Sequence, residues 1–140
     1  MEYIVGIVLA LVVCGLARAS GLDRDRALYT AMAFTVASYY VLFAAMSGST
    51  HTLVVESIVT TAFVLVALIG FMRNLWLVVA SLGGHGVFDA VHDLVYANTG
   101  VPDWWPAFCM AFDVAAAGLL AGLLLWSKLA VGPVHPGSRV

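Results

Sequence analysis

Five long apolar stretches alternate with short polar ones along the chain. Their approximate bounds are residues 3–17, 27–46, 53–72, 75–97 and 105–127. Most approach the roughly 20 residues that an α-helix needs to cross a hydrocarbon core about 30 Å thick, although the first is short. The pattern predicts an all-α polytopic membrane bundle of five transmembrane helices. Residues 1–127 would form a single domain, followed by an irregular tail at 128–140.

Composition supports a membrane environment. Of the 140 residues, 63% are hydrophobic and only 10% are charged, whereas about 25% are charged in a typical soluble domain. Mean hydropathy is +1.02. Such a chain lacks the polar side chains to cover its surface in water, so we interpret it as an integral membrane protein. The net charge of −2 gives no electrostatic basis for binding nucleic acid.

Basic residues predict the orientation of the bundle. With five spans, all six lysine and arginine residues fall on one side: Arg18, Arg24, Arg26, Arg73, Lys128 and Arg139. The opposite side has Glu2, His51 and Asp103 and no lysine or arginine. By the positive-inside rule, the N-terminus is outside and the C-terminus is cytoplasmic. This orientation predicts a multi-pass protein of the inner (plasma) membrane with a cytoplasmic tail.

Two further features concern single helices. The start Met1-Glu2 has no positive charge, so we expect the first segment to be a retained span and not a cleaved signal peptide. Near the other end, Gly118 and Gly122 form a GxxxG sequence, a pattern typical of closely packed membrane helices. We therefore expect a neighbouring helix against these two glycines.

Ionisable residues concentrate between residues 83 and 113. His85, Asp89 and His92 follow the spacing i, i+4, i+7, which places them on one face of a helix, with Asp93 at its edge. Asp113 lies eight residues after the start of the next segment, at the depth of Asp89 on an antiparallel neighbour. Ionisable side chains within a membrane face a bundle interior or a cavity and usually mark function. Together with Tyr39, Tyr40 and Glu56, they predict a polar layer in the outer half of the bilayer.

Histidine and carboxylate side chains are suitable ligands for zinc or iron. Histidines at i and i+7 lie about 10 Å apart along a helix axis, so an aspartate must complete any single-metal site; a dinuclear site or a chain of proton-exchanging groups is also possible. Cys109 is one helical turn from Asp113, and neither cysteine belongs to a CxxC pair. We predict His85, Asp89, His92 and Asp113 as metal ligands, with Asp93 or Glu56 as general base or supporting group.

These residues favour a metal-dependent enzyme, hydrolytic or oxidative, that acts on a lipidic substrate in the bilayer. Two other functions stay open. One is a proton relay or the transport of an ion or small molecule; the other is a structural or ligand-binding role. A small bundle of this kind is also compatible with a homo-oligomer.

The sequence HGVFDAVHD, followed by NTGVPDWWPAFCMAFD, resembles a family of short bacterial inner-membrane proteins known only as a domain of unknown function. The resemblance covers nearly all of the chain and implies a membrane protein without implying a mechanism. More distantly, the chain is similar to membrane hydrolases related to alkaline ceramidases and to bacterial carotene-cleaving oxygenases, which use polar residues in spanning helices. It is shorter than either and lacks their full ligand sets.

Overall fold

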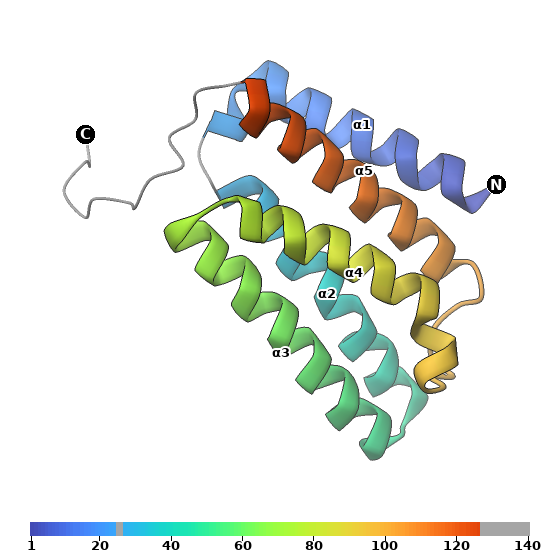
Figure 1. Ribbon diagram of the computed structural model, residues 1–140. Coiled ribbons are helices and arrows are strands. Elements are labelled where there is room, and N and C mark those ends of the chain that lie inside the picture. The colour runs from blue at the N-terminus through green and yellow to red at the C-terminus, as the bar shows by residue number, and fades with distance from the viewer. Residues whose placement is uncertain (25–26, 127–140) are drawn as a thin grey trace.

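The computed structural model describes residues 1–24 and 27–126, and this part of the chain is entirely helical, without a β-strand (Figure 1). The α-helices are α1 (Glu2–Ser20), α2 (Ala27–Ser47), α3 (Thr50–Arg73), α4 (Trp76–Val95) and α5 (Trp105–Trp126), and a 3-10 turn, η1 (Leu22–Arg24), follows α1. The prediction of an all-α bundle is confirmed. The predicted tail at 128–140 lies outside the described residues.

Local sequence explains where the helices end. Gly21 and Gly48 adopt positive φ angles of 79° and 72°, which glycine tolerates, and they terminate α1 and α2. Ser49 caps α3 by accepting a hydrogen bond from the Thr52 N–H. Between α3 and α4, the Asn74 side chain accepts from the Trp76 N–H at 3.0 Å. Asn74 thus supports the start of α4, as expected, although Leu75 is the residue immediately before the helix.

Helix α5 lies between α1 and α4, and α3 packs against both α4 and α2 (Figure 1). Helix α1 packs mainly on α5 and η1, and its Cys14 also contacts Tyr29 of α2. The N-terminus and the α4–α5 connection lie at one end of the bundle, and the α3–α4 turn lies at the other. Arg18 and Arg73, in the last turns of α1 and α3, share this second end. We refer to the end with the N-terminus as the N-terminal end.

Four of the helices, α1, α2, α3 and α5, are long and apolar enough to cross a membrane. Helix α4 has 20 residues, but His85, Asp89, His92 and Asp93 lower its mean hydropathy below that of the others. Its polar side chains are the ones that the sequence places on one face. The helix that carries the predicted site is therefore the least membrane-like one.

Close packing of α5 depends on glycines other than the expected pair. A Cβ atom at Gly6 of α1 would collide with the carbonyl oxygen of Phe108, and one at Gly86 of α4 would lie 3.0 Å from Cγ2 of Val114. A Cβ atom at Gly118 or Gly122 would have no atom of the other described segments within 4 Å. The expectation that the GxxxG sequence packs against a neighbouring helix is therefore wrong for this bundle. The helices meet α5 on a different face and nearer its start.

Candidate metal centre

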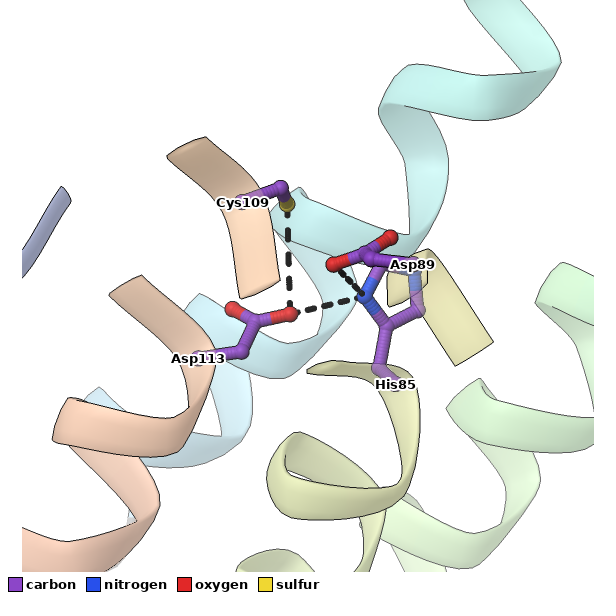
Figure 2. Close-up of side chains that lie close together, drawn as sticks. All are labelled: His85, Asp89, Cys109 and Asp113. Atoms are coloured by element: carbon purple, nitrogen blue, oxygen red, sulfur yellow. Dashed lines mark hydrogen bonds and ion pairs between the residues drawn. The ribbon is translucent and has the colours of Figure 1, made fainter. Parts of the chain in front are cut away.

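Helices α4 and α5 bring four potential metal ligands together inside the bundle. His85 and Asp89 come from α4, and Cys109 and Asp113 come from α5 (Figure 2). One ligand atom from each of the four lies within 4.8 Å of the others, and all four residues are buried. We call these four residues the metal group. It lies in the half of the bundle nearer the N-terminal end.

A single glycine allows the two helices to approach closely here. The Cβ atom that Gly86 lacks would lie 3.2 Å from the carbonyl oxygen of Met110 and 3.3 Å from Cβ of Asp113. Each helix contributes its two ligands at the spacing i, i+4, which places them on one face, one turn apart. Because α4 and α5 touch at Gly86, these two faces meet.

The metal group is short of hydrogen-bond donors. Nδ1 of His85 lies 2.7 Å from Oδ2 of Asp113 and 3.5 Å from Oδ2 of Asp89. The Cys109 thiol is 3.9 Å from Oδ2 of Asp113. Within the described part of the chain, neither oxygen of Asp89 accepts a hydrogen bond of good geometry, and neither does Oδ1 of Asp113. Even a protonated His85 would balance only one of the two carboxylate charges, and unbalanced charge is costly away from water.

These donors fit a divalent transition metal ion. Zinc is commonly bound by cysteine, histidine and aspartate, at distances that place ligand atoms about 3.5 Å apart in a tetrahedral site. Iron also accepts imidazole and carboxylate ligands. The ligand atoms of the metal group lie between 2.7 Å and 4.8 Å apart, a range that includes the spacing in a tetrahedral zinc site. The four residues can therefore each offer one ligand atom to a single ion.

A second polar network lies next to the metal group and is centred on Glu56 of α3. Its Oε1 atom faces Nε2 of His92 at 2.9 Å and accepts from Nδ2 of Asn98 at 2.8 Å. Its Oε2 atom accepts from the Tyr96 hydroxyl at 2.8 Å. On the other side of the His92 ring, Nδ1 lies 3.0 Å from Oδ1 of Asp93. Carboxylates on both ring nitrogens are fully satisfied only if both nitrogens carry protons.

Tyr96 follows the end of α4 and closes this network. Burial, together with the neighbouring Glu56 carboxylate, raises the pKa of the Tyr96 phenol above its ordinary value. The hydroxyl therefore stays protonated and remains a hydrogen-bond donor to Glu56. The network holds the connection after α4 onto α3.

Tyr40 of α2 lies between the two groups. Its ring is 4.4 Å from the His92 ring and 5.8 Å from the His85 ring, centroid to centroid. Its hydroxyl is buried and interacts with the Asp89 carboxylate, although it makes no hydrogen bond of good geometry with any described residue. Tyr39 instead packs on Trp105 at 4.8 Å. Of the two tyrosines expected in the polar layer, Tyr40 is the one that faces it.

The structure thus brings together three of the four predicted ligands, His85, Asp89 and Asp113. His92 is not in the metal group, because both of its ring nitrogens face the carboxylates of Glu56 and Asp93. Cys109 is the fourth member instead. The sequence indicates Cys109 through its spacing to Asp113, which equals the spacing of His85 to Asp89.

Two cavities reach the metal group from different directions. One, of about 710 Å³, lies between α1, α2 and α5; its walls are mostly apolar, and Cys109 is among its lining residues. The other, of about 340 Å³, lies between α1, α4 and α5 and is lined by Asp89, Asp93 and Asp103, among others. We call the first the apolar groove and the second the acidic cavity.

No protein-family model, curated protein or solved structure matches this chain. The resemblance to a family of short inner-membrane proteins therefore stays a prediction. Function has to be argued from the metal group and its surroundings.

Proposed function

We propose that this chain is a five-span inner-membrane protein whose metal group binds a divalent transition metal ion and serves an enzyme that acts on a lipidic substrate. The observation that carries the proposal is the set of three buried carboxylate oxygens without hydrogen bonds beside an imidazole and a thiol. Such oxygens are costly when they are buried, and a cation held between the two carboxylates would balance their charge.

The fifth span in this proposal is α4. Its buried residues include His85, Asp89 and His92, whereas Val87 and Leu94, on its outward side, are 64% and 85% exposed. A helix whose polar side chains face the bundle and whose apolar ones face outward can cross a bilayer. The alternating connections and the placement of the basic residues support an outside N-terminus.

Topology gives the first prediction. A reporter fused after Val140 is expected to be cytoplasmic, and one inserted at Ser49 or Gly100 is expected to be outside, because alternate connections lie on opposite sides of a five-span bundle. Paired alkaline phosphatase and green fluorescent protein fusions at each site measure this. A C-terminal fusion that is active only in the periplasm would contradict the five-span arrangement.

A bound metal ion would supply a Lewis acid and lower the pKa of a coordinated water towards 7. The side chains of the protein supply the other functional groups. Tyr40 offers a buried hydroxyl without a hydrogen bond beside the metal group. Asp93, with a side chain 74% exposed, lines the acidic cavity together with Asp89 and is our choice of general base. Glu56 accepts three hydrogen bonds, so we assign it to holding His92, Tyr96 and Asn98 in place.

The lipidic nature of the substrate is supported by the apolar groove. Its volume of about 710 Å³ is within the range of about 300–1,000 Å³ that small-molecule sites occupy. Val5 and Leu9 of α1 and Val36 of α2 are among its lining residues, and Cys109 connects it to the metal group. The contact of Cys14 with Tyr29 lies beyond the groove, towards the end of α1, so the groove offers a hydrocarbon chain a way in between α1 and α2 at the N-terminal end.

The function is tested by incubating the protein in vesicles of bacterial lipid with and without added zinc or iron, and comparing the lipids by mass spectrometry. We expect a metal-dependent change in one lipid class, absent when the metal is removed by a chelator and absent with His85→Gln. Vesicles containing His92→Gln are the matched control, because His92 lies outside the metal group. Unchanged lipids with fully metal-loaded protein would contradict the enzyme proposal.

A proton relay is the second function that an observation favours. Tyr40 lies between the metal group and the Glu56 network, so two sets of imidazole and carboxylate groups are nearly continuous. Towards the opposite end of α4, however, the next buried polar side chain is Ser81, which donates to the carbonyl oxygen of Phe63. Proton flux in liposomes that Asp89→Asn abolishes, in protein without stoichiometric metal, would favour the relay.

A further inference from the structure

The acidic cavity contains three carboxylates and reaches the metal group from the N-terminal end. Asp103 precedes α5 and Asp93 lies in the last turn of α4, and both line the cavity with Asp89. A neighbouring cavity of about 200 Å³ is also lined by Asp93 and Asp103. No lysine or arginine of the described chain lines either cavity. Their local charge is therefore negative.

Acidic residues alone do not define a cation site, but Asp89 provides a second and independent observation. It is only 2% exposed, and neither of its oxygens accepts a hydrogen bond. The same residue lines the acidic cavity and belongs to the metal group. It therefore connects the cavity with the metal group through a buried carboxylate that accepts no hydrogen bond from a described residue and lies 3.5 Å from Nδ1 of His85.

We infer that the acidic cavity is the loading route of the metal group, through which a divalent cation enters from the N-terminal end, attracted by Asp103 and Asp93 and transferred to Asp89. This inference rests on the proposed metal binding. A recess lined by one sign of charge within low-dielectric walls concentrates cations and can raise association rates by about 10- to 1,000-fold. The exposed carboxylates of Asp103 and Asp93 would act on the rate of entry, and the buried ligands would determine the affinity.

The apolar groove offers no comparable route. Its polar lining is limited to residues such as Thr35, and Glu2 at its end is 2.7 Å from the N-terminal ammonium group. A hydrated cation would lose its water there, and the one carboxylate in the lining is already paired with the ammonium group. The two openings therefore separate the cation from the lipid: the cation enters beside Asp89 and a hydrocarbon chain lies beside Cys109.

The test measures how fast cobalt(II) binds. Metal-free protein in detergent is mixed with cobalt(II) chloride in a stopped-flow instrument, and the absorption band of cobalt bound to the Cys109 thiolate is followed. We expect Asp103→Asn combined with Asp93→Asn to slow binding by about ten-fold or more, with the same final amount of bound cobalt. The dependence of the rate on salt is also expected to weaken, because exposed carboxylates attract cations through a field that ions screen.

The matched control is Glu2→Gln, which removes a carboxylate whose side chain is 43% exposed, at the same end of the bundle but outside the acidic cavity. It is expected to bind cobalt at the wild-type rate. A double variant that also binds at the wild-type rate would overturn the loading route and leave the metal group intact. A reduced final amount of cobalt would make Asp93 or Asp103 a ligand and also overturn it. No thiolate band in the wild-type protein would overturn the proposed metal binding itself.

Discussion

Replacing Asp113 by asparagine is expected to remove the metal ion from the protein. Oδ2 of Asp113 lies 2.7 Å from Nδ1 of His85 and 3.9 Å from the Cys109 sulfur, so it is central to the metal group. Asparagine has nearly the same shape but lacks the charge that a divalent cation requires. Because even the loss of a group behind a ligand costs 10- to 100-fold in affinity, we expect a loss of at least about 100-fold here.

The measurement is elemental analysis of protein purified gently in detergent, without added metal or chelator. Wild-type protein is expected to hold close to one equivalent of zinc or iron, and Asp113→Asn almost none. His92→Gln is the matched control: it changes a buried histidine on α4 whose nitrogens face Glu56 and Asp93, so the metal should stay. If His92→Gln lost its metal as fully as Asp113→Asn while still folded, the ligand set predicted from the sequence would be the better one.

The pattern of apolar segments was sufficient to predict the bundle, because each helix carries its own signal. The expected segment at 105–127 corresponds to α5, Trp105–Trp126, and the one at 27–46 corresponds to α2, Ala27–Ser47. The close contacts were not predictable in this way. The GxxxG sequence at Gly118 and Gly122 is a local pattern, whereas the contact at Gly86 depends on how α4 and α5 are rotated against each other.

The candidate site was predicted only in part for the same reason: its contacts depend on how the helices are arranged around one another. Helical periodicity placed His85, Asp89 and His92 on one face of α4, and this is correct, because all three are buried. It could not show that α5 covers the first two and α3 covers the third. Each histidine has its partner on another helix, far away in the sequence: Asp113 for His85 and Glu56 for His92. Cys109 was underestimated because a lone thiol in an apolar helix resembles an ordinary core residue.

Replacing Glu56 by alanine is expected to destabilise the bundle strongly and leave the metal group in place. Glu56 is fully buried and accepts hydrogen bonds from the side chains of Tyr96 and Asn98 while facing Nε2 of His92. Without its carboxylate, the buried side chains of His92 and Asn98 and the half-buried Tyr96 lose this acceptor, and any positive charge on His92 loses its fully buried partner. Removing one member of a buried ion pair costs about 3–5 kcal/mol, so we expect a loss of unfolding free energy in this range.

The free energy of unfolding is measured by denaturant titration in detergent, followed by tryptophan fluorescence, with metal content determined on the same samples. Glu56→Gln keeps one acceptor oxygen and is expected to lose less, about 1–3 kcal/mol. Glu2→Gln, at an exposed position, is the control for charge removal and should be neutral. A Glu56→Ala protein that unfolds like the wild type would show that this network does not hold α3 and α4 together. Loss of metal at unchanged stability would instead place Glu56 in the metal centre, because only a ligand or its direct support affects the ion without affecting the fold.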